Sequence, residues 1–262
     1  VLNAMDARQR GARILTRTKV ISAERVGDRW SIALQSADGR TEQVQARALI
    51  NAGGPWVGAL LDQTIRSDSR APMRLVKGSH IVFPRLFDHA KAYIFQNTDG
   101  RIVFAIPYED DFTLIGTTDV DYIGDPSAAE ITADEVTYLC KSVSEYFRTP
   151  VIPNSVVWTY AGVRALLDEG GAAQKLSRDY VLTLDGGGAA APLLNVCGGK
   201  LTTFRRLAED ALRKLGGVME IGPAWTAGAV LPGGDFPVDG APALEQSLMD
   251  AAPALDAALA RR

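Results

Sequence analysis

The sequence predicts a mixed α/β and α+β fold, in which two units of different sheet type are interleaved along the chain. At two places, residues 48–65 and 193–215, a hydrophobic strand runs into glycines and then into a helical pattern. Between them, residues 73–118 have the pattern of successive strands with no helix among them. The first pattern is typical of strands joined by helices, whereas the second is a separate block of strands.

The composition is that of a globular protein. The chain has 262 residues, of which 47% are hydrophobic and 23% charged, and its net charge is −3. A negative net charge argues against a protein that binds nucleic acid through overall basicity. No apolar run approaches the roughly 18–20 residues that a membrane span needs. With two cysteines and two histidines, we expect neither a disulfide scaffold nor a metal centre.

Both ends have the pattern expected of a piece of a longer protein. Val1 stands inside a helical pattern that Gly11 would terminate. An Ala- and Leu-rich helix is expected over residues 241–262, with nothing after it to pack against. We therefore interpret the chain as part of a longer protein.

The elements follow from local patterns. The turns Gly27-Asp28 and Asp38-Gly39 predict a small antiparallel meander near the start of the chain. Thr132 and Glu135 have the spacing of a capping box and start the longest internal helix. Strands are expected at residues 13–26, 30–35, 41–46, 48–52, 79–83, 92–96, 102–106, 112–116, 156–162, 180–184 and 193–197, and helices at 56–65, 132–147 and 201–215.

The strongest candidate site is the turn from strand to helix at Gly198 and Gly199. A helix N-terminus offers unsatisfied N–H groups and a partial positive charge, and the following residues add a cationic side chain and two hydroxyls (Lys200, Thr202 and Thr203). This set suits an anion, or a ring that gains negative charge on reduction. The alternative is a turn that serves packing only. Residues 51–56 have the same pattern, and two such turns fit one nucleotide-bearing cofactor at the ends of a sheet.

A second glycine-rich stretch is rejected as a nucleotide site. Residues 186–191 formally match G-x-G-x-x-[GA], but Pro192 and a strand follow them. No helix N-terminus would then meet a pyrophosphate, so we expect a hairpin turn at Asp185-Gly186 instead.

Two arginines and one histidine are further candidates. If Arg164 and Arg178 point into the space facing Lys200, the three cations would bind a phosphate dianion. From the residues alone, pairing of each arginine with a neighbour such as Asp168 or Asp179 is favoured. His80 precedes an apolar run and is either a hydrogen-bonded core residue or a catalytic base. Asp119 is either a cap or a site residue.

Several segments together resemble one known family. They are, in chain order, Asn51-Ala-Gly-Gly-Pro-Trp56, Met73-Arg-Leu-Val-Lys-Gly-Ser-His-Ile-Val-Phe-Pro84, Ile115-Gly-Thr-Thr-Asp119, Tyr160-Ala-Gly-Val-Arg-Ala-Leu166, Ser177-Arg-Asp-Tyr180 and Gly198-Gly-Lys-Leu-Thr-Thr-Phe-Arg205. The set is similar to the FAD-dependent glycerol-3-phosphate dehydrogenases of the respiratory, quinone-linked type.

The resemblance implies a partial FAD-binding domain of the D-amino-acid-oxidase type, interleaved with a substrate domain on an antiparallel sheet. The implied limits are 1–70 and 178–217 for the FAD-binding domain, 71–177 for the substrate domain, and 218–262 for a linker and the start of a helical domain. It implies that Arg164, Arg178 and Lys200 hold the substrate phosphate, with Arg164 also at the reacting centre, and that His80 accepts the proton. It implies FAD contacts from Val20, Asn51, Ala52, Gly53, Pro55, Trp56, Gly162, Gly198, Gly199, Lys200, Leu201, Thr202 and Thr203.

The implied reaction is oxidation of sn-glycerol 3-phosphate to dihydroxyacetone phosphate, with electrons passed to a quinone. The resemblance also implies peripheral attachment to the cytoplasmic face of the inner membrane, through parts largely outside this chain, and it allows a homodimer. The alternatives are an oxidase that uses oxygen and a non-catalytic phosphate-binding module. The family's N-terminal glycine fingerprint is not in the sequence. We therefore expect the chain by itself to retain little FAD and no turnover.

Overall fold

The computed structural model describes residues 1–69, 73–168, 170 and 179–261. Its contacts divide the chain into one unit of Val1–Thr18 with Pro223–Arg262 and a second unit of Lys19–Gly222. Both domain boundaries expected near residues 70 and 178 fall at segments outside the described residues, and the predicted domain limits stay a prediction.

The first unit is helical. It contains α1 (Leu2–Gln9), the 3₁₀ turn η7 (Thr226–Gly228), α5 (Ala241–Ala251) and α6 (Ala257–Arg261). Gly11 follows α1 with a φ of +94°, as expected of a residue that ends a helix. The single helix predicted over residues 241–262 is wrong. Two helices are found because Pro253 disfavours a helical conformation at the residue before it.

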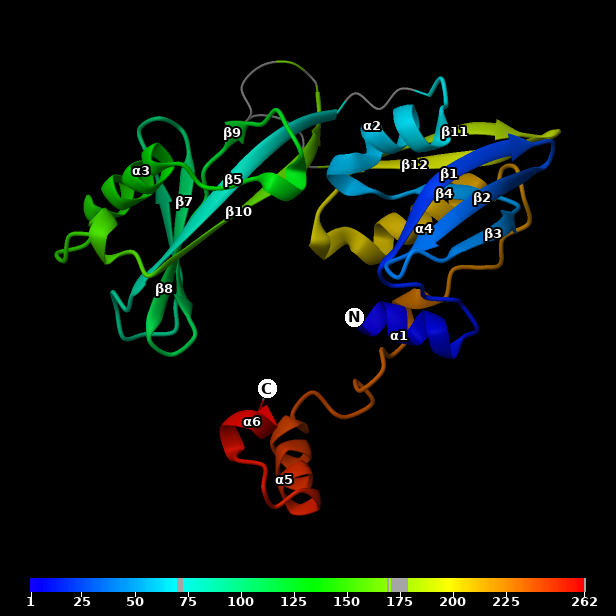
Figure 1. Cartoon of the computed structure of the whole chain (residues 1–262). Helices are drawn as coiled ribbons and strands as arrows, with labels where there is room; N and C mark the ends of the chain where they lie inside the picture. Colours follow the sequence, from blue (N-terminus) through cyan, green and yellow to red (C-terminus); the bar gives the residue numbers. More distant parts are fainter. Residues whose placement is uncertain (70–72, 169, 171–178, 262) are drawn as a thin grey trace. The chain divides into compact units, whose positions relative to one another are not determined.

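The second unit begins with the predicted meander. β1 (Thr18–Val26), β2 (Arg29–Ser36) and β3 (Thr41–Ala46) pair in that order (Figure 1). The first strand starts at Thr18, five residues later than predicted. One face is packed into the core through Ala23 and Trp30.

A second sheet has the order β11–β12–β4 and is built from β11 (Tyr180–Gly187), β12 (Ala190–Gly198) and β4 (Leu49–Asn51). β4 is parallel to β12, whereas β11 is antiparallel to it, so the expected hairpin is confirmed. Its turn lies at Gly188-Ala189 and not at Asp185-Gly186 as predicted, because Gly187 still pairs with Ala190 beyond an irregularity in the ladder. α4 (Phe204–Leu215) packs on this sheet with Ala211 and Leu215 against Leu194. The strand at 48–52 was predicted to be buried, but Ile50 is 47% exposed because only one face of β4 is covered.

The helix predicted at residues 56–65 is irregular. It consists of the 3₁₀ turn η1 (Gly54–Trp56), one turn of α-helix α2 (Val57–Ala59) and a π-helical segment η2 (Leu60–Ile65). Its apolar face is as expected, because Val57 and Leu61 are buried. Arg66 ends the segment in the left-handed conformation, with a φ of +53°.

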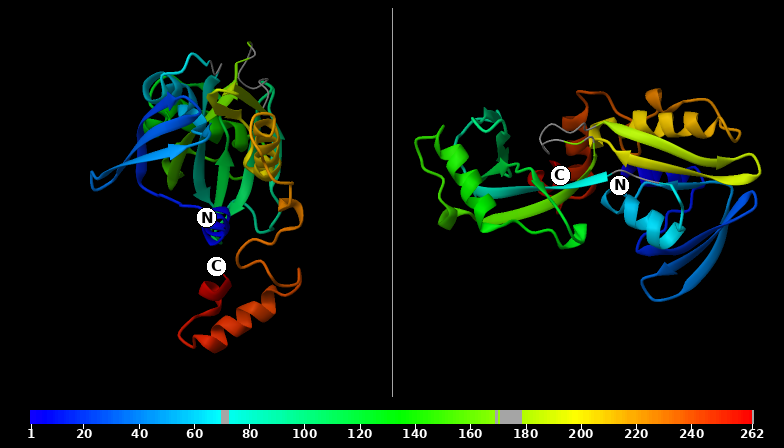
Figure 2. Two further views of the ribbon diagram at one scale, coloured as in Figure 1. Left: turned by 90° about the vertical axis from the view of Figure 1, so that its right-hand side faces the viewer. Right: turned by 90° about the horizontal axis from the view of Figure 1, so that it is seen from above.

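The third sheet is antiparallel, as predicted for residues 73–118. Its strands are β10 (Trp158–Leu167), β5 (Met73–Pro84), β8 (Phe112–Gly116), β7 (Ile102–Tyr108) and β6 (Tyr93–Gln96) in that order, with the short β9 (Val120–Asp121) beside β5. β5 and β10 form a long ribbon (Figures 1 and 2). Short 3₁₀ turns are found at η3 (Pro126–Ala128), η4 (Pro153–Ser155) and η6 (Leu201–Thr203).

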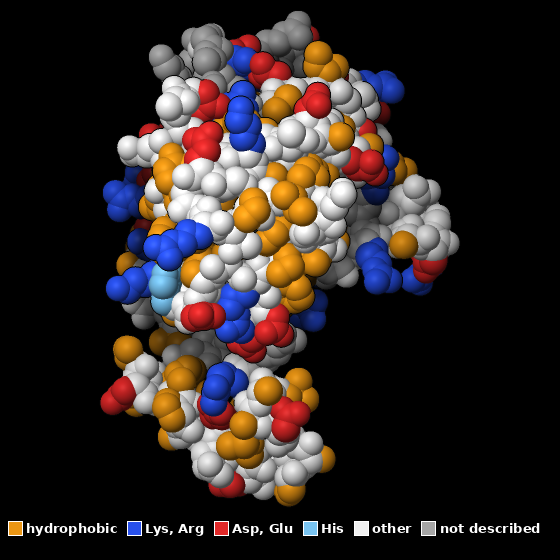
Figure 3. Space-filling view, turned by 90° about the vertical axis from the view of Figure 1, so that its left-hand side faces the viewer, with side chains coloured by type: hydrophobic (Ala, Val, Ile, Leu, Met, Phe, Trp, Pro, Cys, Tyr) orange, Lys and Arg blue, Asp and Glu red, His pale blue; other side chains and the backbone are white. Residues whose placement is uncertain are grey.

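Helix α3 (Ala133–Ser144) covers one face of this sheet. Leu139 and Val143 pack against Ile81 and Ile115, and the capping box of Thr132 and Glu135 is present as predicted. On the outer surface at this end of the unit, acidic and basic side chains are interspersed around hydrophobic ones (Figure 3). Attraction of an anion to this sheet therefore depends on individual side chains, because the charges on the face in view are mixed in sign.

Candidate active site

Strand register places the predicted site residues on the face of the sheet opposite α3. His80 is paired with Tyr160 on one side and with Gly116 on the other, and Arg164 is paired with Val76. Side chains alternate between the faces of a strand, so His80 and Arg164 share a face. Lys77 and Ser79 alternate with Gly78 and His80 on β5 and point to the α3 side, where both contact Glu135.

This face adjoins the glycine turn at the end of β12. The η1 turn contacts both β10 and β12. The carbonyl oxygen of Ala165, next to Arg164, is 3.7 Å from the position of a Cβ on Gly198. The fold therefore brings together three segments that sequence reasoning proposed separately: residues 51–56, the strand of Gly162 and Arg164, and the turn at Gly198.

Arg164 is held by a short loop after β8. Its Nη1 is 2.9 Å from Oδ1 of Asp119, and its Nη2 donates to Oγ1 of Thr117 at 2.8 Å. Asp119, which the sequence left open between a cap and a site residue, therefore contacts a predicted site residue. The guanidinium also lies across Gly78, where a Cβ would collide with it.

His80 lies flat against Tyr160, with ring centroids 4.8 Å apart and an angle of 6° between the planes. On its other side, the ring occupies the space that a Cβ of Gly116 would need. Burial, and after it the positive charge of Arg164, lower the pKa of His80 below its ordinary value of 6.5. The imidazole is therefore neutral at pH 7. Its Nδ1 is buried with no hydrogen-bond partner within the described ranges.

On the α3 side of the sheet, a buried ion pair supports the loop that carries Thr117 and Asp119. Nζ of Lys77 is 2.8 Å from Oε2 of Glu135, and both side chains are only 7% exposed. The other carboxylate oxygen accepts hydrogen bonds from Ser79 Oγ and Thr118 Oγ1. Burial alone would raise the pKa of Glu135, but these bonds outweigh it and lower the pKa to about 2.

The turn at the end of β12 can accept a ligand. Gly198 and Gly199 have φ values of +74° and +100°, and a Cβ on Gly198 would be 2.8 Å from the carbonyl oxygen of Asp179. Lys200 and Thr202 are exposed and Leu201 is 89% exposed, so the start of this helical segment is open. An open helix start and a buried imidazole nitrogen without a partner both fit a polar ring cofactor such as FAD.

The remaining residues that were predicted to contact FAD differ in how far they are exposed. Asn51 is 4% exposed and uses its amide to hold the turn, donating to the carbonyl of Val57 and to Asn195. Trp56 is 42% exposed, and space lies open over Gly162. Val20 is on β1 and packs against the core of the second unit. Arg178 lies outside the described residues.

Sequence reasoning missed the residues that position the others. Thr117, Gly78 and Tyr160 lie within the motifs but were given no role, because their roles depend on which strands are neighbours. The ion pair of Lys77 could have been expected from the sequence, because a lysine inside an apolar strand needs a partner when it is buried. Nothing local identified Glu135 as that partner.

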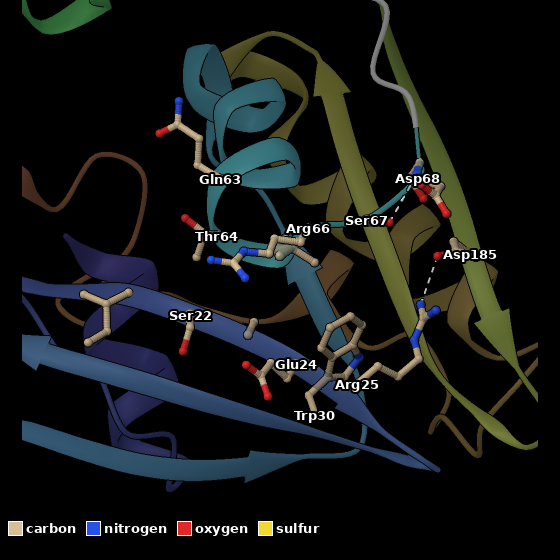
Figure 4. Close-up of a pocket in the computed structure, with 14 residues that line it drawn as sticks. Ser22, Glu24, Arg25, Trp30, Gln63, Thr64, Arg66, Ser67, Asp68 and Asp185 are labelled. Atoms are coloured by element: carbon tan, nitrogen blue, oxygen red, sulfur yellow. Dashed lines mark hydrogen bonds and ion pairs between the residues drawn. The ribbon is translucent and has the colours of Figure 1, made fainter.

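A separate cavity of about 770 Å³ lies between β1 and the η2 segment (Figure 4). Its walls carry both signs of charge, and Arg25 on one side is already paired with Asp185 at 2.9 Å. None of the predicted site residues lines it.

Across the described ranges, no helix has the length and apolar character to cross a membrane. The same ranges contain no cluster of three or more potential metal ligands.

A histidine with a lowered pKa and an arginine share one face of a sheet, beside a glycine turn that leads into a helix, and this arrangement fits a cofactor-dependent oxidoreductase. The chain belongs to the FAD-dependent oxidoreductase family, whose model matches residues 1–205. The predicted family and its D-amino-acid-oxidase type of fold are thereby confirmed, as is dependence on FAD.

Two relatives found by sequence and one solved structure are named as dehydrogenases. A glycerol-3-phosphate dehydrogenase of Pseudomonas tolaasii is 47% identical over 90% of this chain, and a D-erythritol 1-phosphate dehydrogenase of Brucella abortus is 44% identical over 90%. The structure of a glycerol-3-phosphate dehydrogenase from Bacillus halodurans complexed with FAD matches all of this chain, with a TM-score of 0.81 and 28% identity. The chain spans about half of each relative: 46%, 47% and 51% of their lengths.

Proposed function

We propose that this chain provides the substrate site of an enzyme that oxidises sn-glycerol 3-phosphate to dihydroxyacetone phosphate. The observation that carries the proposal is the placement of a neutral His80 and the cationic Arg164 on one open face of the same sheet. The substrate needs these two groups, a proton acceptor for its secondary hydroxyl and a cation for its phosphate. The three named dehydrogenases act, by their names, on phosphorylated polyols.

Phosphate binding is assigned to Arg164, Lys200 and Arg178. The guanidinium of Arg164 presents a fork that matches two phosphate oxygens, and Lys200 is exposed at the start of the neighbouring helical segment. Anchoring the phosphate fixes the distance of C2 and its hydroxyl from the rest of the site, which lowers the entropic cost of reaching the transition state.

His80 is assigned as the proton acceptor. A lowered pKa keeps the ring neutral, and its stacking on Tyr160 and packing over Gly116 fix its orientation. The chemistry that bound FAD would supply is acceptance of the hydride from C2. The residues that would hold FAD are those of the turns at 51–56 and 198–203, with Gly162 and Val20, and the N-terminal end of the helical segment would favour negative charge there.

We further propose a quinone as the electron acceptor and peripheral attachment to the cytoplasmic face of the inner membrane, as a monomer or homodimer. These assignments depend on the family resemblance. Steady-state reduction of a soluble quinone analogue, with oxygen uptake measured in parallel, tests the acceptor. Rapid oxygen uptake without quinone would contradict it and support an oxidase.

The substrate assignment is tested by an anaerobic half-reaction. An enzyme of the full length of its relatives, loaded with FAD, is mixed with glycerol 3-phosphate, and bleaching of the flavin absorbance is followed. We expect Arg164→Ala to raise the apparent Kd about 10- to 100-fold, because it removes a charge-assisted pair of about 1.5–3 kcal/mol. Arg74→Ala, in an ion pair elsewhere on β5, is the control and should leave the Kd unchanged.

Bleaching by D-erythritol 1-phosphate but not by glycerol 3-phosphate would change the substrate within the same class. No bleaching by either compound, with FAD bound, would contradict the proposal.

A smaller change tests the geometry around Arg164. Gly78→Ala should raise the KM for glycerol 3-phosphate about tenfold, because the new methyl group occupies the place of the guanidinium. Gly78 does not have a positive φ, so the backbone accepts alanine and the free energy of unfolding should change by less than about 1 kcal/mol. The KM is measured by steady-state kinetics and the stability by urea unfolding. A large loss of stability with an unchanged KM would contradict this geometry.

A further inference from the structure

We propose that Asp119, together with Thr117, is a positioning residue that orients the guanidinium of Arg164 toward the substrate phosphate. The inference rests on the proposed function, in which Arg164 binds that phosphate. It adds residues that do not touch the substrate but act through the arginine.

The contacts hold the guanidinium at two points. Nη1 of Arg164 is 2.9 Å from Oδ1 of Asp119, and Nη2 donates to the hydroxyl of Thr117 at 2.8 Å. The Asp119 side chain is 8% exposed and that of Arg164 is 30% exposed, so the arginine is open on one side only. Two fixed contacts on a planar group determine its plane as well as its position, and a bidentate contact with phosphate depends on that plane.

The loop that carries these residues is itself fixed from below. Between Thr117 and Asp119, Thr118 is 1% exposed, and it accepts a hydrogen bond from the Ser79 N–H at 2.9 Å and donates to Glu135 at 2.7 Å. Glu135 is in turn paired with the buried Lys77. The loop therefore connects a rigid, buried network on the α3 side of the sheet to Arg164 on the open side.

Two physical effects of Asp119 oppose each other. Its negative charge repels a nearby phosphate, which would weaken binding, whereas its hold on Arg164 strengthens binding by preorganisation. The repulsion is reduced because Asp119 is already paired with a cation. An arginine released from both contacts would gain the rotamer freedom of a long side chain, which must be lost again on binding. We expect preorganisation to outweigh repulsion.

The test uses the full-length enzyme loaded with FAD. Asp119→Asn keeps the size of the side chain, and it should raise the KM for glycerol 3-phosphate about tenfold while kcat changes less than threefold. Thr117→Val, which removes only the neutral hydrogen bond, should raise KM about threefold. Asp121→Asn is the matched control, because this aspartate lies two residues further along and pairs with Arg74. It should leave both constants unchanged.

A double-mutant cycle distinguishes positioning from general support of the fold. In an Arg164→Ala background, Asp119→Asn should change KM less than twofold, because there is no guanidinium left to orient. An unchanged or lowered KM in Asp119→Asn or Thr117→Val would overturn the inference, as would the same tenfold rise in the Arg164→Ala background. Failure of the proposed function would appear differently, as an unsubstituted enzyme whose flavin is not reduced by glycerol 3-phosphate, and the inference would then fail with it.

Discussion

Replacing Glu135 by alanine is expected to lower the free energy of unfolding by about 3–5 kcal/mol. The substitution leaves the ammonium of Lys77 buried without its counter-charge and removes partners from Ser79 and Thr118. It also breaks the capping box with Thr132 that starts α3. Urea unfolding followed by circular dichroism measures the change.

The control for this substitution is Asp121→Ala, which breaks an ion pair whose carboxylate side chain is 56% exposed. Exposed pairs contribute less than about 1 kcal/mol, so this variant should remain close to the unsubstituted chain. Equal losses in the two variants would contradict the special role given to the buried pair.

The same carboxylate makes stability depend on pH. The pKa of Glu135 is about 2 in the folded chain against 4.5 for an ordinary glutamate, so its contribution is fully present above pH 4.5 and is lost as the pH falls toward 2. The difference corresponds to about 3 kcal/mol. A stability profile measured between pH 5 and 2 should be correspondingly flatter in Glu135→Gln.

Replacing His80 by alanine is expected to lower kcat for glycerol 3-phosphate by about 10²–10⁴-fold, with a much smaller change in KM. His80 is the proton acceptor in the proposed reaction, and Arg164 rather than His80 binds the phosphate. The lowered pKa of the histidine adds a second expectation. Protonation should inactivate the free enzyme only below pH 6.5, so the acid limb of the kcat/KM profile should lie below that value and disappear in His80→Ala.

A second variant, Gly116→Ala, tests whether the position of the His80 ring matters. It keeps the imidazole but places a methyl group in the space that the ring occupies, so the ring must turn away from its position against Tyr160. We expect kcat to fall about tenfold or more, with the acid limb shifted toward the ordinary histidine value as the ring becomes more exposed. A fall in kcat of less than fivefold in His80→Ala would assign the base to another group.

Local patterns in the sequence predicted local structure well. The capping box at Thr132, the hairpin of β11 and β12 and the glycine turn at Gly198 were all found because each depends on residues a few positions apart. The break in the last helix was missed, although Pro253 marked it. The π-helical segment η2 has the same apolar spacing as an α-helix over one turn, so periodicity could not reveal it.

The partners within the site could not be predicted in the same way. Glu135 was recognised as a cap, but its pairing with Lys77 joins positions far apart in sequence and depends on α3 lying over β5. From the residues alone, Arg164 was expected to pair with a neighbour such as Asp168 or Asp179. The carboxylate that the structure shows against it is Asp119, from a loop that only the strand order brings near. The family resemblance supplied a role for Arg164 without its contacts.

The two-sided character of β5 limits how this part of the chain can change during evolution. Alternate residues serve separate purposes: Lys77 and Ser79 belong to the buried network, whereas Gly78 and His80 belong to the site. An insertion or deletion of one residue within Met73–Pro84 would exchange the two sets, burying the histidine and exposing the ion pair. Differences in length among descendants of this sequence should therefore accumulate in the connecting loops, while this strand keeps a constant length.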